Sequence, residues 1–354
     1  MTRITLATYD DDPPEGGQGV LVRGMREALV RAGVDVTTVA GRGAHAVDIP
    51  RRTGRAPLDL SIRLARHPES LLRSRPDVVH AMGGPGGVLL VRRLPVPLVY
   101  TANHTYAQAH PLTSPKRALS LLERRVYRRA ARVLCISAST ADAVRRLGVP
   151  ADRVELLMPG VDVARLDAGA ADTAREPFRL LFAGRLTPEK RPLDAVAAMV
   201  RLCTDDGRVR GTVVGRGPLE SAVRAAAAAA PRSAVEVLGG VDDAGLAREY
   251  ARASVVLIPS AYEGLGLVAL EAMAMGAAVV AADVTGLRDA VGEEGLLVTP
   301  ADVGALATVV AALLADEPRR ADLAAAGRER VRRRHGWDAA ATRLVSLYRE
   351  LAAG

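Results

Sequence analysis

Short, nearly unbroken apolar runs alternate with longer amphipathic stretches along the first half of the chain. The apolar runs cover residues 3–8, 34–39, 77–80, 98–101, 132–136 and 154–157. Stretches with the spacing of helices cover residues 20–32, 59–74, 115–129 and 139–147. Unbroken apolar strands are typical of sheets covered on both faces, and strands that alternate with helices form parallel sheets. The pattern therefore predicts an α/β domain with a doubly wound parallel sheet.

The same alternation restarts after a polar segment rich in alanine and glycine. The apolar runs of the second half cover residues 179–183, 210–214, 235–238, 255–258, 278–281 and 295–298. Its helical stretches cover residues 192–203, 219–230, 244–253, 267–275, 303–315 and 337–352. We predict two Rossmann-like domains, residues 1–163 and 177–334, that face each other across a cleft. Residues 164–176 are the predicted linker.

Composition narrows the choice of partners only slightly. The 354 residues are enough for two domains, and the formal net charge of +8 favours nucleic acid, phosphorylated small molecules or anionic membranes. Arginine greatly outnumbers lysine and alanine is abundant, which a GC-rich genome would also produce, so the charge is a weak signal. A basic patch interleaved with aromatic residues is missing. We therefore expect no nucleic-acid partner.

Cysteine use and hydropathy indicate a cytoplasmic protein. Cys135 and Cys203 each stand alone in an apolar run, so we predict core residues rather than a disulfide or a metal site. The sequence shows no leader-like segment and no apolar stretch near the roughly 20 residues that cross a membrane.

A basic amphipathic pattern covers residues 116–132. Leu119, Leu122, Val126 and Ala130 fall on one face of a helix in this segment, and arginines fall on the other. We favour packing of the apolar face on the sheet, with solvated arginines. The alternative is peripheral contact with the inner face of a membrane.

The connection after the first apolar run is rich in glycine. Gly16, Gly17 and Gly19 do not match G-x-G-x-x-G, so the dinucleotide fingerprint is absent. Their backbone amides and the N-terminus of the following helix are suited to an anion, and the alternative is a flexible loop. Gly215 follows a strand of the second half and is predicted to line the same cleft.

Two cations follow the first strand of the second half. Gly184-Arg185 and Lys190 come after residues 179–183, at the carboxyl end of a parallel strand. Cations in this place are suited to a diphosphate. A solvated helix start is the alternative, but cations there oppose the helix dipole, so we favour binding.

Histidine and aspartate residues also follow strands. His104 comes after residues 98–101 and is predicted to be an active-site residue facing the cleft, with a polar loop residue as the alternative. His80 also ends a strand, where we favour a structural role. Residues 10–12, Asp-Asp-Asp, look like a metal–diphosphate motif, but only nine residues precede them. That is too few for the nucleotide-binding half that should come first, and we predict no metal site.

Residues 259–283 carry the most specific pattern. Glu263 precedes Gly264 and Gly266 at the start of an apolar helix that contains Glu271. Glycine amides at a helix N-terminus are suited to phosphate, and a carboxylate beside them is suited to sugar hydroxyls. An acid among apolar residues usually has a partner, which favours a ribose for Glu271. The alternative is a helix cap at Glu263 and a solvated Glu271.

Together these residues resemble the retaining glycosyltransferases of family GT4, which have the GT-B fold. The resemblance covers nearly the whole chain. It rests on PSAYEGLGLVALEAMAMG (259–276), GRLTPEKRP (184–192), PGVD (159–162) and GWD (336–338). It implies that residues 335–354 form a helix that crosses back to the first domain. It also implies a nucleoside-diphosphate sugar as the donor substrate, bound mainly by the second domain, with no cofactor and no metal.

The resemblance also implies a role for each candidate residue. Arg185 and Lys190 would hold the diphosphate and stabilise the leaving group. Glu263 would contact the donor sugar, Glu271 the ribose, and His104 the acceptor side of the sugar. The other implied donor contacts are Gly16, Gly17, Gly184, Gly215, Val241, Leu246, Gly264, Leu265, Gly266 and Leu267.

The acceptor stays open at this level. A hydroxyl of a soluble natural product, a cyclitol or a sugar fits the resemblance, and so does a lipid-linked sugar. A nucleotide-sugar epimerase or hydrolase on the same fold is the alternative enzyme. No residue stands out as a nucleophile, so we favour a front-face path in which the leaving phosphate takes the acceptor proton. The sequence indicates neither the donor sugar and base nor the oligomeric state.

Overall fold

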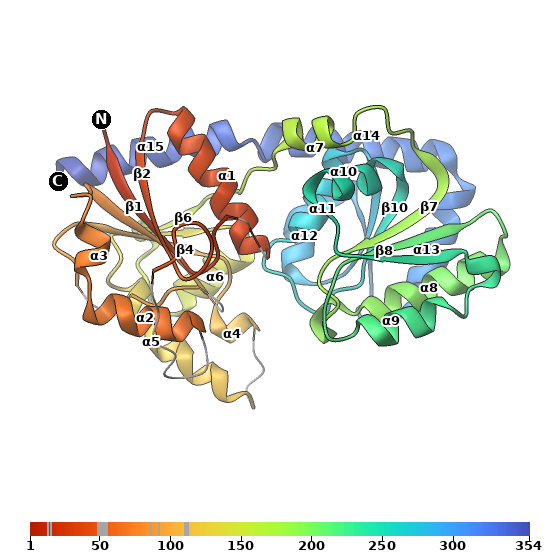
Figure 1. Cartoon of the computed structure of the whole chain (residues 1–354), viewed down its shortest axis with the longest axis horizontal. Helices are drawn as coiled ribbons and strands as arrows, with labels where there is room; N and C mark the ends of the chain where they lie inside the picture. Colours follow the sequence, from red (N-terminus) through yellow and green to blue (C-terminus); the bar gives the residue numbers. More distant parts are fainter. Residues whose placement is uncertain (13, 15, 48–55, 85–86, 91–92, 110–112) are drawn as a thin grey trace. The chain divides into compact units, whose positions relative to one another are not determined.

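The chain folds into two compact units. The computed structural model describes residues 1–354 except 13, 15, 48–55, 85–86, 91–92 and 110–112 (Figure 1). Unit 1 consists of Met1–Gly160 together with His335–Gly354, and unit 2 consists of Val161–Arg334. Each unit is built on a parallel sheet with helices on both faces. The predicted α/β class is therefore confirmed.

Unit 1 contains a parallel sheet with the strand order β2-β1-β3-β4-β5-β6. Its strands are β1 (Arg3–Thr8), β2 (Asp35–Ala40), β3 (Val78–Gly83), β4 (Leu98–Ala102), β5 (Arg132–Cys135) and β6 (Val154–Leu156). Its α-helices are α1 (Gly17–Arg31), α2 (Ala56–Arg66), α3 (Glu69–Leu72), α4 (Tyr106–Ala109), α5 (Leu119–Tyr127), α6 (Ala138–Arg146) and α15 (Trp337–Ala353). The inner strands β1, β3, β4 and β5 are almost wholly buried, which explains their unbroken apolar sequences, whereas the edge strands β2 and β6 are partly exposed.

Different helices cover the two faces of this sheet. On β3, Val79 and Ala81 belong to a core that includes Leu60 of α2. His80, between them, points to the opposite face and meets Tyr348 of α15. This is the two-residue alternation of a strand. On that second face α15 packs against α1, as Figure 1 shows.

The helix α15 is fastened to unit 1 by buried polar and aromatic contacts. Nδ1 of His80 lies 2.5 Å from Oη of Tyr348, and Nε2 lies 2.7 Å from Oγ1 of Thr101. Burial lowers the pKa of His80 to about 3, so its ring is neutral at pH 7. Trp337 occupies space left by two glycines, because a Cβ on Gly24 or Gly160 would lie 2.4 or 2.3 Å from its ring.

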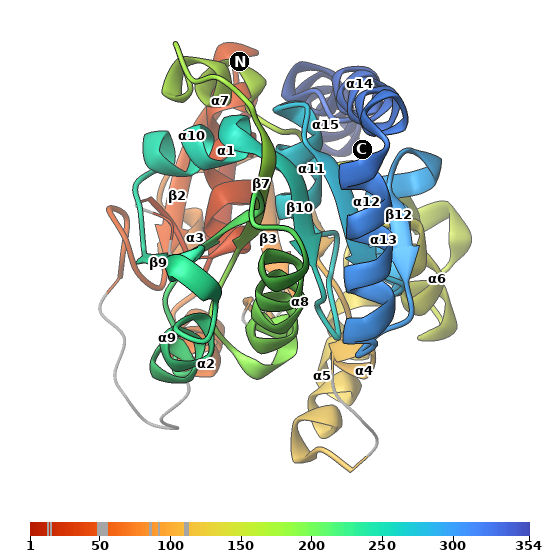
Figure 2. The same cartoon turned by 90° about the vertical axis from the view of Figure 1, so that its right-hand side faces the viewer.

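Unit 2 contains a second parallel sheet, with the order β12-β11-β10-β7-β8-β9. Its strands are β7 (Glu176–Ala183), β8 (Arg210–Val214), β9 (Val235–Gly239), β10 (Ala253–Ile258), β11 (Ala278–Ala282) and β12 (Leu296–Val298). Its α-helices are α7 (Val163–Gly169), α8 (Pro192–Asp205), α9 (Glu220–Ala227), α10 (Asp243–Arg252), α11 (Leu267–Ala274), α12 (Thr285–Val291), α13 (Val303–Ala315) and α14 (Glu317–Arg334). Figure 2 shows β7, β10 and α8 in this unit from a second direction. No helix in the described residues is both long and apolar enough to span a membrane.

The linker predicted at residues 164–176 is wrong. The chain passes from unit 1 to unit 2 between Gly160 and Val161, and most of the supposed linker is structured. Asp162 caps α7 by accepting a hydrogen bond from the Arg165 amide at 3.0 Å. Gly169 packs against α10, since a Cβ there would lie 2.9 Å from the side chain of Ala247. Small residues that serve close helix packing have the same composition as a flexible loop, which explains the error.

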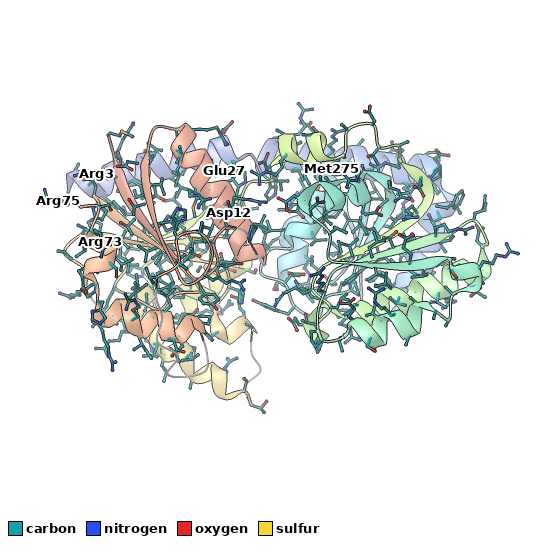
Figure 3. The ribbon with its side chains drawn as sticks, viewed as in Figure 1. Arg3, Asp12, Glu27, Arg73, Arg75 and Met275 are labelled. Atoms are coloured by element: carbon teal, nitrogen blue, oxygen red, sulfur yellow. The ribbon has the colours of Figure 1, made fainter. Side chains whose placement is uncertain are left out.

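Arg175, which lies between α7 and β7, also attaches this segment to the rest of unit 2. Arg175 donates hydrogen bonds to the carbonyl of Ala253, and from Nη2 to the carbonyl of Met275 at 2.5 Å; Met275 is labelled in Figure 3. Burial lowers the pKa of Arg175, as do two neighbouring arginines. The segment before β7 is thus part of the packed body of unit 2.

Other differences from the predicted elements have local causes. The helix predicted at 59–74 is two helices, α2 and α3, separated by His67 and Pro68. Proline removes an amide donor and disfavours helical geometry in the residue before it. The helix α14 was not predicted, because its sequence is rich in arginine and alanine and shows little apolar periodicity.

Candidate functional site

The carboxyl edge of the unit 2 sheet brings Lys190 and Glu263 together. Lys190 follows β7 and Glu263 follows β10, which are neighbouring parallel strands. Nζ of Lys190 lies 2.5 Å from Oε1 of Glu263, and the hydroxyl of Ser260 donates to the same oxygen at 3.0 Å. The amide of Ala261 donates to the carbonyl of Glu189 at 2.8 Å and joins the two connections. Glu263, predicted to bind the sugar, and Lys190, predicted to bind the diphosphate, are therefore in direct contact.

Arg191, whose backbone lies in the left-handed region, sets the direction of the turn that carries Lys190. Pro188–Lys190 form a 3₁₀ turn, and Arg191 then adopts φ 50° and ψ 49° as the N-cap of α8. A non-glycine residue in this region carries backbone strain, which must be offset by its surroundings. Nε of Arg191 lies 2.6 Å from Oδ2 of Asp194, one turn into α8. This ion pair holds the strained residue, and with it Lys190, in place.

Glycines shape the N-terminus of α11. Gly266 is its N-cap in the left-handed region (φ 81°), and no side chain caps the first amides of the helix. Leu265 is buried, whereas Gly264 and Leu267 are half-buried. A Cβ on Gly286 would lie 2.3 Å from the carbonyl oxygen of Glu263, so α12 approaches this loop through a glycine. The amides beside Glu263 form the kind of helix terminus that binds phosphate.

A tyrosine positions Glu271. The hydroxyl of Tyr250, in α10, donates to Oε2 of Glu271 at 2.9 Å. Tyr250 is fully buried, and burial together with the Glu271 charge raises its pKa well above the usual range. Tyr250 is therefore a neutral donor that fixes one carboxylate oxygen. The sequence prediction missed Tyr250. The only available signal was the need for a partner beside an acid in an apolar helix.

Backbone crowding explains two of the predicted glycines. Gly184 and Gly215 directly follow the neighbouring strands β7 and β8 and have φ values of 150° and 146°. A Cβ on Gly215 would lie 1.8 Å from the carbonyl oxygen of Gly184, so no larger residue fits without rearrangement. The amide of Gly215 donates to Gly239 at 2.7 Å. The carboxyl ends of β7, β8 and β9 are therefore held together beside Gly184, where the residues predicted to bind the diphosphate begin.

Three further predicted residues of unit 2 are more exposed. The Arg185 side chain is 61% exposed, and Nη2 lies 3.5 Å from Oε1 of Glu189. Surface pairs of this kind contribute little to stability, so the guanidinium can exchange partners at little cost. Val241 is exposed and Leu246 half-buried, before and within α10.

In unit 1, His104 lies on the connection between β4 and α4. Its side chain is half-buried. The amide of Tyr106, two residues on, donates to Glu123 at 2.9 Å. Gly84 approaches this connection with φ 87°, and a Cβ there would lie 2.5 Å from the carbonyl oxygen of His104. The backbone that carries His104 is therefore closely held.

The start of α1 holds Gly16 as the N-cap and Gly17 as the first residue. The buried carboxylate of Asp10 accepts a hydrogen bond from the Gly19 amide at 3.2 Å and pairs with Arg42 at 3.0 Å. A negative charge from the protein is thus already placed at this helix terminus. It weakens the attraction that Gly16 and Gly17 were expected to have for an anion.

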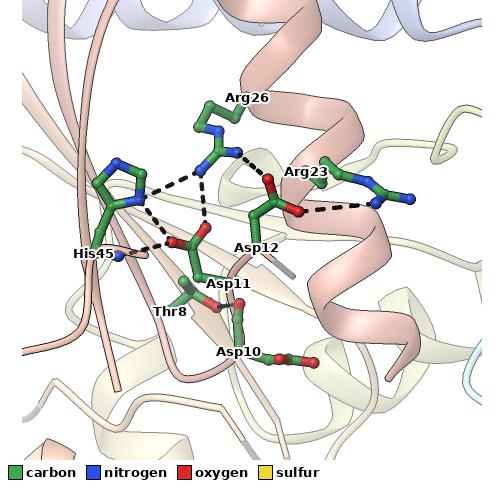
Figure 4. Close-up of polar contacts among 7 residues, drawn as sticks. All are labelled: Thr8, Asp10, Asp11, Asp12, Arg23, Arg26 and His45. Carbon is green, nitrogen blue, oxygen red and sulfur yellow. Dashed lines mark hydrogen bonds and ion pairs between the residues drawn. The ribbon is translucent and has the colours of Figure 1, made fainter. Parts of the chain in front are cut away.

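The aspartates that follow Asp10 are also paired with cations, as Figure 4 shows. Asp11 is fully buried and lies 2.9 Å from Arg26 and 2.7 Å from Nδ1 of His45. Asp12 lies within ion-pair distance of Arg23 and Arg26. In the described residues no group of three or more His, Cys, Asp or Glu side chains is arranged to hold a metal ion. The run joins β1 to α1 by charge pairing.

The fold is similar to that of solved glycosyltransferases. The structure is similar to sucrose-phosphate synthase from Thermosynechococcus elongatus, with a TM-score of 0.79 and 25% sequence identity over 100% of both chains. It is similar to HepE from Anabaena, solved with UDP and glucose, with a TM-score of 0.75 and 19% identity over 99% of this chain and 100% of that one. The protein thus has the GT-B fold.

Sequence comparison defines the family. Residues 15–165 match the family model described as Glycosyltransferase Family 4, and residues 177–316 match Glycosyl transferases group 1. D-inositol 3-phosphate glycosyltransferase of Xylanimonas cellulosilytica is 34% identical over 94% of this chain and 91% of its own length. Glycogen synthase of Mycobacterium tuberculosis is 31% identical over 77% and 69%. The chain belongs to glycosyltransferase family 4, as predicted.

Proposed function

We propose that this enzyme transfers a hexose-type sugar from a nucleoside-diphosphate sugar to a hydroxyl acceptor with retention of configuration and without a metal or another cofactor. The observation that carries the proposal is the Lys190–Glu263 pair beside the N-terminus of α11. A cation, a carboxylate and helix amides in one place suit the charged and hydroxylated parts of one donor molecule.

Each partner of the pair has a separate task in this proposal. A diphosphate would give Lys190 a second anionic partner and draw Arg185 away from the half-buried Glu189. Glu263 would then accept hydrogen bonds from sugar hydroxyls, while the α11 amides and Gly184 contact the phosphates. Glu271, oriented by Tyr250, would accept from the ribose, with Val241 and Leu246 near the base. These cations stabilise charge as it develops on the leaving group.

The proposed reaction follows a front-face path. The acceptor oxygen bonds to the anomeric carbon on the face from which the diphosphate oxygen departs. The released diphosphate takes the acceptor proton, so atoms and charges balance without an enzyme nucleophile. His104 would contact the sugar from unit 1 and limit access of water.

A polyol is the acceptor class that we propose. Several relatives above 30% identity are named D-inositol 3-phosphate glycosyltransferase, and another relative is named glycogen synthase. D-inositol 3-phosphate is therefore the first acceptor to test, followed by free cyclitols and short glucans. The proposal includes a cytoplasmic location, in keeping with the free, buried Cys135 and Cys203.

A thermal-shift panel tests the donor. UDP-, GDP-, ADP- and dTDP-sugars are added to the protein in EDTA, and the matching donor is expected to raise Tm. The stabilising donor is then incubated with each acceptor, and nucleoside diphosphate release and the anomeric configuration of the product are measured. Release that requires acceptor supports transfer, and release without acceptor supports the epimerase or hydrolase alternative. No stabilisation by any donor would contradict the proposal.

A lipid-linked acceptor is a second candidate, favoured by the surface of α5. Val126 is buried, but Leu121 is 70% and Leu122 42% exposed beside the exposed Arg124 and Arg125. The apolar face predicted to pack on the sheet is buried at Val126 and Ala130, and the prediction is wrong for Leu122. Exposed leucines between arginines suit an anionic bilayer. Sedimentation with phosphatidylglycerol vesicles, and its loss in Leu121→Ser/Leu122→Ser, would support this candidate. Equal sedimentation of both proteins would reject it.

A further inference from the structure

A buried carboxylate in α5 supports the connection that carries His104. Glu123 is fully buried. Its Oε2 accepts a hydrogen bond from the amide of Tyr106 at 2.9 Å, and its Oε1 accepts one from the hydroxyl of Tyr127 at 2.8 Å. Buried ionisable groups are costly unless their hydrogen bonds are made, so these two bonds are what keep Glu123 inside.

The bond to Tyr106 acts at the point where the connection becomes helix. Tyr106 is the first residue of α4 and lies two residues after His104. Nη1 of Arg117 also donates to the carbonyl of Ala107 at 2.9 Å. The helix terminus provides an amide, and a carboxylate is a stronger acceptor for it than a neutral group. Glu123 therefore fixes the backbone of α4 through a main-chain group, independent of the side chain at position 106.

The surroundings of Glu123 make an ionisable side chain costly at this position if it only filled space in the core. Burial raises its pKa to about 7, while the bonds from Tyr106 and Tyr127 act in the opposite direction. In the part of the chain that the structure describes, the Glu123 charge is coupled to the buried hydroxyls of Tyr100 in β4 and Tyr127 in α5. An apolar side chain would avoid the burial cost but would leave the Tyr106 amide without this acceptor.

We infer that Glu123 is a positioning residue for sugar transfer, which holds the β4–α4 connection so that His104 keeps a fixed place. The inference rests on the role proposed for His104. Glu123 itself does not touch the substrates. Removing its acceptor lets the connection move and lowers the rate of the chemical step more than the affinity for the donor.

Amide exchange and kinetics together test this inference. The variants are Glu123→Ala, Glu123→Gln, His104→Ala and the double variant Glu123→Ala/His104→Ala. Glu155→Ala, which removes a surface partner of Arg343 in unit 1, is the control. Hydrogen–deuterium exchange is followed in the peptide covering residues 103–109. The kinetic constants kcat and KM are measured with the donor that stabilises the wild-type protein and with D-inositol 3-phosphate.

The expected pattern separates positioning from general stability. Glu123→Ala speeds exchange in residues 103–109 and lowers kcat at least 10-fold, with the donor KM within 2-fold. Glu123→Gln, whose amide oxygen still accepts from Tyr106, restores both properties to within 3-fold. In the His104→Ala background, Glu123→Ala causes no further loss of kcat, because both changes act through one group. The control variant matches the wild type.

Other results overturn the inference. Additive losses in the double variant, or an unchanged kcat in Glu123→Ala, would show that Glu123 does not act through His104. If Glu123→Ala does not fold, Glu123→Asp takes its place, because the shorter side chain keeps the charge but moves it away from the Tyr106 amide. If the wild type transfers no sugar at all, the proposed function fails, and unchanged exchange in residues 103–109 would separately reject the positioning role.

Discussion

The buried carboxylate of Glu123 predicts a specific dependence of stability on pH. The substitution Glu123→Gln keeps the size of the side chain and removes its ionisation. The amide oxygen still accepts from Tyr106, and the amide nitrogen donates to the oxygen of Tyr127. Any pH-dependent difference between the two proteins therefore reports on the ionisation of this one group.

The magnitude follows from the pKa of Glu123. Burial raises it from 4.5 to about 7 in the folded protein, and one pKa unit corresponds to about 1.4 kcal/mol. Between these two values the folded state holds a proton that the unfolded state has released. The wild type therefore has its full stability below pH 4.5 and loses about 3 kcal/mol as pH rises through 7. The glutamine variant does not show this loss, so its free energy of unfolding rises relative to that of the wild type by about 3 kcal/mol between pH 4.5 and pH 8.

Tryptophan fluorescence provides the assay. Trp337 is the single tryptophan of the chain and packs in unit 1, the unit that contains Glu123. Urea unfolding followed at this residue gives the free energy of unfolding of that unit at several pH values from 4.5 to 8. Tyr127→Phe is the companion variant. It removes a bond that lowers the pKa of Glu123, so its loss of stability with rising pH should exceed that of the wild type.

The refuting result is a constant difference. If wild type and Glu123→Gln differ by the same free energy within about 0.5 kcal/mol over the whole pH range, the carboxylate does not titrate between 4.5 and 7. The burial argument would then be wrong. A loss in Tyr127→Phe smaller than that of the wild type would contradict the direction assigned to the Tyr127 bond.

Three further predictions concern unit 2. Lys190→Ala should lower kcat at least 1,000-fold while the circular dichroism spectrum stays unchanged, because its proposed role is to stabilise the leaving group; a wild-type rate would refute that role. Tyr250→Phe removes the hydrogen bond to Glu271, worth about 1.5–3 kcal/mol to a charged group, and should weaken donor binding about 10-fold or more in calorimetry; unchanged affinity would contradict the ribose role. Gly215→Ala forces a Cβ to within 1.8 Å of the Gly184 oxygen and should lower stability by more than about 3 kcal/mol, whereas a neutral effect in urea unfolding would show that the strands separate easily.

The strands were predictable because both faces of each sheet are covered. Unbroken apolar runs such as Leu98–Ala102 carry their burial in the sequence, and parallel order then places the residues that follow at one edge. This argument was enough to place Lys190 and Glu263 at the same edge of one sheet. The α7 region was not predictable in the same way. Its small residues are informative only when the partner helix α10 is known.

Side-chain partners were less predictable than strands. Nothing local to Glu123 distinguishes it from the exposed charges around it in α5, since its burial depends on Tyr106, 17 residues away in the chain. The pairing of Tyr250 with Glu271 likewise depends on how α10 meets α11. In both cases the sequence indicates a polar group among apolar ones, and the tertiary structure supplies the partner.

The assignment of α15 to unit 1 has a consequence for synthesis on the ribosome. Unit 1 begins with the first residues of the chain, but its sheet receives Tyr348 only after all of unit 2 has been made. Until then His80 has no tyrosine beside it, and the grooves at Gly24 and Gly160 that receive Trp337 stay open. Unit 2 is continuous in sequence and is therefore expected to be the first complete body. Unit 2 would therefore complete its fold first, and unit 1, whose synthesis begins first, would complete its fold last.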